Sequence, residues 1–318
     1  MKPRTILKEF HFEGNAQGTT YHISYFAAES IVGYKQFDSI FYKIDSSLSI
    51  YKPYSLISRF NNTNGDVEMD RHLKIIVQRS LEIYKKTGGI SDITVYPIVE
   101  AWGFGAERKS ALPDPATIKN LLPCVGSDKI FMDNNRLRKT NPCVKIDVNG
   151  IAQGYTVDVI ADFLEKNRIQ NYVVELGGEL RVKGHKQPGN VLFRLGIESP
   201  AKNSFDKFSI KKMIQLKEGA VTTSGNYREF IEKGGKKISH LMNPKTGYPL
   251  QNEMISVTIW ARDAITADGY DNALMGMGLK NSFAFLSKQK EMEAYFIYHT
   301  ANGAVADTAT VGFYKVME

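Results

Sequence analysis

The sequence predicts an α+β protein in which long helices are separated by groups of short strands. Apolar residues repeat at helical spacing in several long segments, and strand-like segments with alternating apolar residues lie between them. The regular alternation of one strand with one helix, typical of a doubly wound parallel sheet, is missing. We therefore expect antiparallel sheets in two intimately associated halves, each combining helices with antiparallel strands.

The first half should begin with a strand at 21–27, where apolar and polar residues alternate. A helix at 29–49 follows, because apolar side chains recur there every three to four residues. A second helical stripe at 73–84 is closed by Gly88 and Gly89, a typical C-terminal helix signal. A strand followed by a helix is thus expected to open the fold.

The second half should contain a helix at 153–167, where apolar residues keep the 3.6-residue period. Strands are expected at 172–176, 191–197 and 256–261, before a closing helix near 264–278. No low-complexity linker divides the 318 residues, and 42% of them are hydrophobic. Such a chain can bury a sizeable core as one large domain or two closely packed ones.

The net charge of +7 comes from basic residues spread along the chain, with local clusters such as 233–237. A solvated basic exterior is the usual cause, and an anionic substrate or surface is the alternative. The chain has no zinc-ligand spacing, no aromatic nucleic-acid signature and no basic helix with heptads. We therefore expect no nucleic-acid partner.

The two cysteines, Cys124 and Cys143, each follow a proline in segments that resemble loops or strand edges. They can pair in an oxidising compartment, but two isolated cysteines define no disulfide framework, and we expect free thiols. No apolar run approaches the roughly 20 residues that span a bilayer, and residues 1–14 lack the apolar core of a signal peptide. The compartment stays open on these grounds.

Three glycine-containing segments suit turns that approach a ligand closely. Residues 145–158 should run from a strand into a helix through Gly150 and Gly154, although they match neither the Walker nor the dinucleotide pattern. A structural tight turn explains them equally well. In 221–230, we expect a turn formed by Thr222, Thr223, Ser224 and Gly225. The hydroxyl groups and the Gly225 amide of this turn would donate hydrogen bonds to an anion, or the hydroxyl groups would only cap the turn.

The third segment, 239–249, places His240 ahead of a Pro-Lys-Thr-Gly-Tyr-Pro turn. A lone histidine near a strand end is more often structural than catalytic. The closing helix carries a more specific signal, since Asp268 and Asp271 lie three residues apart and share one helix face. A hard cation such as Mg²⁺ would offset their repulsion, whereas compensation of the helix dipole, worth about 0.3–1 kcal/mol, is the plainer explanation.

Eight segments taken together resemble, in order and spacing, the motifs of the ApbE family, the FAD:protein FMN transferases. They span roughly residues 15–315. The segments are GTTY (18–21), LSIYKPYSLISRFN (48–61), TGGISDITVYPIVEAWGFG (87–105), DVNGIAQGYTVD (147–158), VELGGELRVKG (174–184), TTSGNYREF (222–230), SHLMNPKTGYP (239–249) and TADGYDNALMGMG (266–278).

The resemblance implies one ApbE-like domain at 15–318, preceded by an N-terminal extension at 1–14. Members of this family use Mg²⁺ to cleave FAD, release AMP and attach FMN to a Ser or Thr of an acceptor protein, often a membrane redox-complex subunit. Some members instead hydrolyse FAD to FMN and AMP, and a flavin-binding protein without turnover is a third reading. Many relatives are exported or lipid-anchored, so the resemblance leaves the compartment undecided.

The resemblance also assigns roles to individual residues. Asp268 resembles a metal ligand supported by Asp271, and the Ala152 carbonyl completes the metal site from the facing segment. Asn272 stands where the family usually has a metal-binding threonine, so either its amide oxygen substitutes as a neutral ligand or Asp271 contributes more to metal binding. His240 matches a family histidine, and we expect it to accept the proton of the acceptor hydroxyl.

For FAD, the resemblance points to residues spread over five segments. Gln17 departs from the methionine common at its position. The expected FAD-contacting residues are Gln17, Tyr51, Ile90, Ser91, Asp92, Asn149, Tyr155, Thr222, Thr223, Ser224, Gly225 and Met242. The segment 301–310 is rich in Thr and Ala, but it does not fit an acceptor pattern Asp-Gly-x-Thr-x-Ala-Thr, and we expect a closing strand there.

Overall fold

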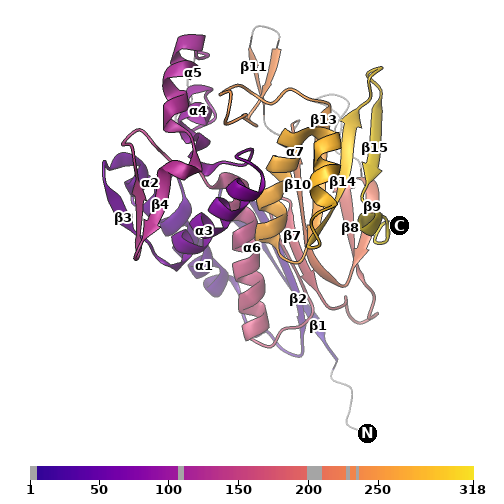
Figure 1. Cartoon of the computed structure of the whole chain (residues 1–318). Coiled ribbons are helices and arrows are strands. Elements are labelled where there is room, and N and C mark those ends of the chain that lie inside the picture. Colours follow the sequence, from indigo (N-terminus) through magenta and orange to yellow (C-terminus); the bar gives the residue numbers. More distant parts are fainter. Residues whose placement is uncertain (1–5, 107–110, 199–209, 227–229, 234–235) are drawn as a thin grey trace.

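An eight-stranded antiparallel sheet forms the centre of the computed structural model, which describes residues 6–106, 111–198, 210–226, 230–233 and 236–318 (Figure 1). In spatial order its strands are β1 (Lys8–Ala16), β2 (Thr19–Ala27), β6 (Tyr172–Leu176), β7 (Glu179–Lys183), β10 (Glu218–Gly225), β13 (Met254–Ala261), β14 (Met292–His299) and β15 (Val305–Ala309). The α+β prediction is confirmed. However, the two halves do not build separate sheets, because β1 and β2 join the strands of the second half.

Smaller sheets lie around this centre. They are β3 (Asp66–Glu68), β5 (Arg136–Lys139) and β4 (Ile130–Asp133); β8 (Phe193–Glu198) with β9 (Ile210–Leu216); and β11 (Phe230–Lys233) with β12 (Lys236–Ser239). The helices are α1 (Tyr34–Leu48), α2 (Leu56–Asn62), α3 (Arg71–Lys86), α4 (Tyr96–Ala101), α5 (Pro115–Leu121), α6 (Asn149–Lys166), α7 (Ala264–Leu286) and α8 (Val311–Tyr314). Within the described part of the chain, none of these helices is long and apolar enough to cross a membrane.

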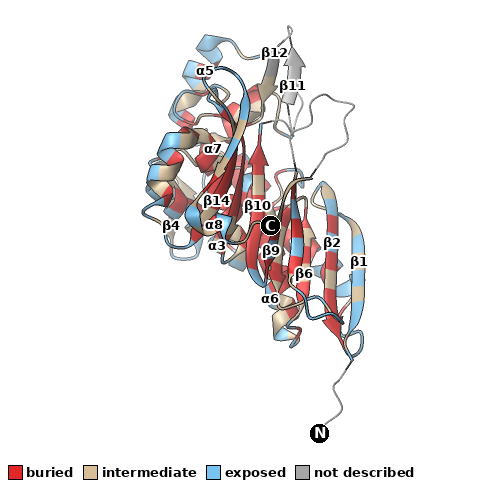
Figure 2. Cartoon of the chain, turned by 90° about the vertical axis from the view of Figure 1, so that its right-hand side faces the viewer, coloured by how far each residue is buried: buried red, intermediate tan, exposed pale blue. Residues whose placement is uncertain are grey.

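The sheet is covered on both faces. Helices α6 and α7 pack side by side on one face, and α1 to α5 lie beyond them (Figure 1). The hairpin β8–β9 packs on the other face, where Phe193 and Ile214 join a buried cluster with Phe26 and Tyr295. Figure 2 shows buried residues concentrated in the central strands, while β1 at the edge stays largely exposed. The core therefore fills both sides of the middle of the sheet.

A hairpin of two strands opens the fold, not the strand and helix expected from the sequence. β1 and β2 are joined by Gln17 and Gly18, whose φ angles of 52° and 79° lie in the left-handed region. Two such residues form the tight turn that matches the twist of antiparallel strands. Residues 8–14, which the sequence suggested belong to an extension, lie in β1. Gln17 in this turn lines the cavity described below.

Several helices follow the expected pattern closely. In α3, Leu73, Ile76 and Val77 are buried, and the Asp70 carboxylate caps the first turn by accepting from the Leu73 amide. The glycines after this helix adopt positive φ angles of 60° and 80°, as a helix stop requires. The predicted strands 172–176 and 256–261 lie within β6 and β13, and the closing strand is β15.

One local prediction is wrong, because residues 222–225 form no turn; they lie in β10 and pair with β13 over Ala220–Gly225. Helix α6 begins at Asn149, before the expected start at 153, and Gly154 lies inside it. The closing helix begins at Ala264 as expected and continues past Gly278, where φ is 74°, to Leu286. Residues 227–229 of the same motif, and 234–235 of the basic cluster, lie outside the described residues.

The expectation of free thiols is also wrong, because Cys124 and Cys143 form a disulfide. The bond joins the end of the segment after α5 to the segment that leads into α6. The two cysteines are 19 residues apart in sequence, and their Cα atoms are 5.4 Å apart. The spacing of the two cysteines in the sequence did not reveal this pairing. The antiparallel strands β4 and β5 lie between the cysteines and bring them together.

Candidate functional site

A cavity of about 810 Å³ lies between the N-terminal ends of α6 and α7, the end of β10, the segment 90–95 and the loop 240–250. This volume is in the range of small-molecule sites in proteins. Most of the predicted site residues line it, although they come from distant parts of the sequence. They are Gln17, Tyr51, Ile90, Ser91, Asp92, Asn149, Ala152, Thr223, Ser224, Gly225, His240, Met242, Asp268, Asp271 and Asn272.

The acidic pair lies in the first turns of α7 and is almost completely buried. Asp268 is 4% exposed and Asp271 is 2% exposed. The Asp268 carboxylate accepts a hydrogen bond of 2.8 Å from the Gly154 amide, and Asp271 Oδ2 accepts one of 3.1 Å from the Thr222 hydroxyl. Asp271 Oδ1 has no hydrogen-bond partner within the described residues. Acids that only offset a helix dipole would remain in solvent, so burial argues against that explanation.

Burial shifts the titration of both carboxyl groups. It raises the pKa of Asp268 to about 7, opposed by the Gly154 amide. Burial also raises the pKa of Asp271 well above its ordinary value, and the neighbouring Asp268 and Glu179 carboxylates raise it further. Two buried carboxylates with an unsatisfied oxygen favour a bound cation, which would stabilise their ionised forms.

The donor atoms fit a hard cation such as Mg²⁺. The described residues contain no group of three or more His, Cys, Asp or Glu side chains placed to hold a metal. Neutral oxygens would therefore have to complete the site, and the Ala152 carbonyl and Asn272 amide line the same cavity. Mg²⁺ is commonly held by one or two carboxylates together with substrate phosphates and water. The residues present fit that arrangement.

Close packing of α6 against α7 positions the acidic pair. A Cβ atom on Gly154 would lie 2.4 Å from the Ala264 carbonyl oxygen and 2.6 Å from the Asp268 Cβ. Only glycine allows this approach, which brings the Gly154 amide to Asp268. The Asp158 carboxylate holds the start of α7 by accepting from the amides of Ala264 and Ile265 at 3.0 and 2.8 Å.

Asn272 is already engaged in the site. Its Oδ1 accepts a hydrogen bond of 2.7 Å from the Ser224 hydroxyl. A Cβ atom on Gly150 would lie 2.7 Å from Asn272 Nδ2, so the amide packs directly against the start of α6. An amide oxygen has two lone pairs, and one remains for a further contact. Asn272 thus links β10, α6 and α7 at the point where the carboxylates face the cavity.

The Ala152 carbonyl lies in the first turn of α6 and accepts a 2.8 Å hydrogen bond from the Thr156 hydroxyl. That hydroxyl is also 3.0 Å from Gln17 Oε1. The hairpin turn of β1–β2 therefore contacts α6 directly beside the acidic pair.

Two predicted residues do not line the cavity. Tyr155 is buried, and its hydroxyl is 2.9 Å from His72 Nδ1. Thr222 is fully buried in β10 and bonds Asp271. Asp92 does line the cavity, but its carboxylate accepts four hydrogen bonds from Thr94 and Ser127. Its observed contacts therefore stabilise the segment around η1 (Ile93–Val95).

Tyr51 and Asn149 lie toward the open side of the cavity. The Tyr51 side chain is exposed, and its hydroxyl accepts a long hydrogen bond of 3.4 Å from the Asn149 amide. The Asp147 carboxylate, in turn, accepts from the Asn149 main-chain amide at 2.8 Å. An exposed aromatic ring beside an oriented amide is suited to a planar ligand ring.

His240 lies at the start of an irregular loop that closes another side of the cavity. Its ring is half-buried and meets the Phe104 ring edge-on, with the centroids 6.3 Å apart. The loop is held by main-chain pairing of Met242 with Pro249 and by a 2.8 Å bond from the Asn243 amide to the Tyr248 carbonyl. The predicted turn is therefore ordered, with His240 and Met242 on the cavity wall.

The sequence reasoning missed two acidic residues on the wall. Glu179 is only 7% exposed and lies close enough to influence the Asp271 carboxylate. Burial raises the pKa of Asp147 to about 6. Both residues lie in segments that carry the family resemblance: Glu179 follows two glycines, and Asp147 precedes Asn149. A single acidic residue in a local motif does not indicate whether its side chain is buried.

Comparisons with known proteins show which family the sequence resembles. The sequence model of the ApbE family matches residues 17–296. The chain is 33% identical over 324 residues to an FAD:protein FMN transferase of Haemophilus influenzae, covering 98% of this chain and 92% of that protein. It is 33% identical over 303 residues to the protein of the same name from Vibrio cholerae, covering 93% and 89%.

Solved structures show the same similarity. The flavin transferase ApbE from Vibrio cholerae superposes with a TM-score of 0.87 at 30% identity, covering 98% of this chain and 99% of the other. The apo form of the Pseudomonas stutzeri flavinyl transferase ApbE gives a TM-score of 0.86 at 28% identity, covering 98% and 97%.

Proposed function

The chain belongs to the ApbE family, and we propose that this transferase is a Mg²⁺-dependent FAD:protein FMN transferase. In the proposed reaction, a Ser or Thr hydroxyl of an acceptor protein attacks the phosphorus on the FMN side of FAD. A phosphoester bond to the acceptor forms, the P–O bond to AMP breaks, and AMP leaves. The acceptor hydroxyl gives up its proton to the enzyme.

The observation that best supports this proposal is the buried carboxylate pair on the wall of a cavity of about 810 Å³. Asp268 and Asp271 would hold Mg²⁺ with the Ala152 carbonyl and the Asn272 amide oxygen. Bound there, Mg²⁺ supplies positive charge that offsets the charge on the transferring phosphoryl group and on AMP. Thr222 keeps the Asp271 carboxylate oriented by donating to Oδ2.

His240 is the proposed proton acceptor. It lines the same cavity as the carboxylates, and its edge-on contact with Phe104 fixes one side of the ring. A positioned imidazole that takes a proton from an attacking hydroxyl typically contributes about 10²–10⁴-fold to the rate. The proton would thus pass from the acceptor Ser or Thr to a ring nitrogen of His240.

The remaining wall residues are proposed to bind FAD. Tyr51 and Asn149 suit a planar ring and its edge, Ser224 offers a hydroxyl group beside Asn272, and Thr223 also lines the cavity. The segment Ile90 to Asp92, Gln17, Gly225 and Met242 supply the rest of the contact surface. Tyr155 would act indirectly, because its hydroxyl bonds His72 and its buried ring supports the first turns of α6.

The direct test is to incubate the protein with FAD and Mg²⁺, with and without a carrier domain that displays Asp-Gly-x-Thr-x-Ala-Thr. We expect AMP release together with a gain of one FMN in acceptor mass. Release of AMP without acceptor would instead identify an FAD pyrophosphatase. Absence of both products would contradict the proposed function.

Variants at His240 test its role. We expect His240→Ala and His240→Asn to lower FMN transfer by about 10²–10⁴-fold while FAD affinity stays within about twofold. His299→Asn is the matched control, because His299 is exposed and lies outside the cavity. Transfer at the wild-type rate by the His240 variants would show that another group accepts the proton.

A further inference from the structure

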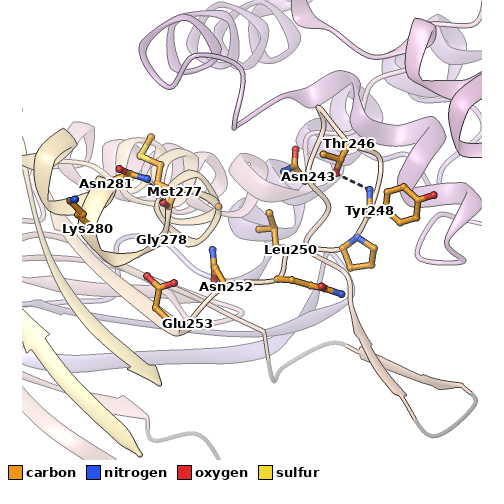
Figure 3. A pocket seen from close by; sticks show the side chains of 13 residues that line it. Asn243, Thr246, Tyr248, Leu250, Asn252, Glu253, Met277, Gly278, Lys280 and Asn281 are labelled. Carbon is orange, nitrogen blue, oxygen red and sulfur yellow. Dashed lines mark hydrogen bonds between the residues drawn. The ribbon is translucent and has the colours of Figure 1, made fainter. Parts of the chain in front are cut away.

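A second cavity, of about 590 Å³, lies between the loop at 243–253 and helix α7 (Figure 3). Loop residues between Asn243 and Glu253 form one side of it. Residues of α7 between Gly276 and Asn281 form the other. We refer to it as the amide groove, because asparagine and glutamine side chains contribute much of its lining.

The amide groove adjoins the cavity that is proposed to bind FAD, which we call the flavin cavity. Leu250 lines both spaces, and the loop between them alternates, with Met242 facing the flavin cavity and Asn243 facing the groove. Along α7, Asn272 lines the flavin cavity and Gly276 lines the groove. Four helical residues correspond to about 6 Å, so two or three residues of an extended peptide would bridge the two spaces.

Helix α7 is interrupted at Gly278, and two side chains of the groove form hydrogen bonds with the main-chain groups left unpaired there. The Glu253 carboxylate accepts a 2.7 Å hydrogen bond from the Leu279 amide. Asn252 donates to the Met275 carbonyl at 2.7 Å. Because these exposed helix ends are already satisfied, the groove is formed before any partner arrives, which lowers the entropic cost of binding.

The lining retains groups suited to a polypeptide main chain. Within the described residues, no hydrogen bond engages the Gln251 side chain, and Asn281 uses only its Nδ2, which donates to the Met277 carbonyl. Side-chain amides offer both a donor and an acceptor, so they can pair with main-chain groups of either kind. Lys280 adds an exposed cation that forms no ion pair with the described residues.

We propose that the amide groove binds the acceptor protein, holding the extended segment next to its modified Ser or Thr. The proposal rests on the proposed transferase function. FAD would occupy the flavin cavity, and the groove is the neighbouring space that shares Leu250 with that cavity, so an acceptor segment held in the groove would lie close to the proposed reaction site. Lys280 favours a segment with an acidic side chain close to the modified residue.

The test compares Lys280→Glu and Gln251→Ala with Lys288→Glu, an identical charge reversal at an exposed position outside the groove. The probe is the carrier domain that displays Asp-Gly-x-Thr-x-Ala-Thr. We expect Lys280→Glu to raise KM for the probe about tenfold and Gln251→Ala about threefold, with kcat at saturating probe nearly unchanged. FAD affinity should stay within twofold in all three variants. Retained FAD affinity would also show that the variants are folded.

A second measurement locates the contact directly. A photo-crosslinking residue at position 281 should capture the probe, whereas the same residue at position 288 should not. Unchanged KM in Lys280→Glu, or equal capture from both positions, would overturn the docking site while leaving the transferase function intact. Failure of the wild-type protein to modify the probe at all would instead count against the proposed function.

Discussion

At the scale of single residues, burial distinguishes the metal-site explanation from the dipole explanation for the acidic pair. The sequence placed Asp268 and Asp271 on one helix face, and both readings require that. Only the fold buries them and leaves Asp271 Oδ1 without a partner in the described residues. Desolvation of two neighbouring carboxylates is unfavourable unless protons or a cation compensate it.

This burial predicts how stability depends on pH. The ordinary pKa of Asp is about 3.9, and burial raises that of Asp268 to about 7. The folded protein then binds protons more tightly than the unfolded chain, so the metal-free protein should lose stability as the pH rises from about 4 to 7. Mg²⁺ at 100 times its Kd should restore about 2.7 kcal/mol, mainly at high pH.

Thermal unfolding at pH 5 and pH 8, with EDTA or with Mg²⁺, measures this effect. Asp268→Asn should flatten the pH dependence and remove the response to Mg²⁺. A wild-type protein whose melting temperature in EDTA rises over this pH range would contradict the assignment.

Asn272 presents a separate question, because it replaces the threonine common in the family. Its Oδ1 already accepts from Ser224, which orients the amide toward the carboxylates. We expect Asn272→Ala to weaken Mg²⁺ binding about tenfold and Asp271→Ala to weaken it more, since a carboxylate contributes charge as well as an oxygen. Titration calorimetry with Mg²⁺ measures both. An unchanged affinity in Asn272→Ala would remove this residue from the metal site.

At the scale of elements, the contact between α6 and α7 determines the position of the buried carboxylates. In the sequence, Gly154 belongs to a Gly-rich segment at the start of a predicted helix, and such segments often approach ligands. Its real function is to let two helices touch, and the absence of a side chain brings its amide to Asp268. A local motif cannot reveal this, because the residues that require glycine belong to a helix more than 100 positions later.

Gly154→Ala should therefore be costly. The added Cβ would meet the Ala264 carbonyl at 2.4 Å, and a main-chain atom cannot move aside as a flexible side chain can. We expect a loss of about 1–3 kcal/mol in the free energy of unfolding and weaker Mg²⁺ binding. Gly65→Ala is the control, because a Cβ there meets no atom within 4 Å. Equal stability of the two variants in urea would show that the helices can separate without cost.

Residues 222–225 show in the same way that contacts with distant segments override a local sequence pattern in a strand. Thr, Thr, Ser and Gly in succession are typical of turns, but β10 lies between β7 and β13 in the middle of the sheet. Pairing of residues 222–225 with β13 outweighs the weak local preference of these residues for a turn. The strand consequently presents Thr222 and Ser224 to α7, where each bonds one site residue.

At the scale of the whole molecule, one large sheet joins the two halves of the sequence. β2 pairs with β6 across roughly 150 residues, which places the Gln17 turn beside α6. The disulfide adds a covalent connection over a shorter distance in the sequence, between the segment after α5 and the segment that enters α6. Neither cysteine lines the flavin cavity or the amide groove.

Removing this disulfide should affect stability more than function. The bond closes a loop with a sequence separation of 19 residues, for which the chain-entropy estimate is about 3 kcal/mol. We expect Cys124→Ala with Cys143→Ser to lower the free energy of unfolding in urea by roughly that amount, while FAD affinity is retained. Dithiothreitol should produce a similar loss in the wild-type protein and none in the double variant. A wild-type midpoint unaffected by reduction would contradict the prediction.

Sequence patterns predicted the periodic helices and the α+β class, and motif order predicted 15 residues that line the flavin cavity, although many other lining residues were not foreseen. These follow from local patterns, since apolar periodicity and motif order are written in neighbouring positions. Only the folded structure shows that the Asp268–Asp271 pair is desolvated, that the Tyr155 hydroxyl bonds His72, that Cys124 meets Cys143, and that a groove shares Leu250 with the flavin cavity. The physical reason is that burial and long-range pairing depend on contacts between segments far apart in the chain, which no local pattern records.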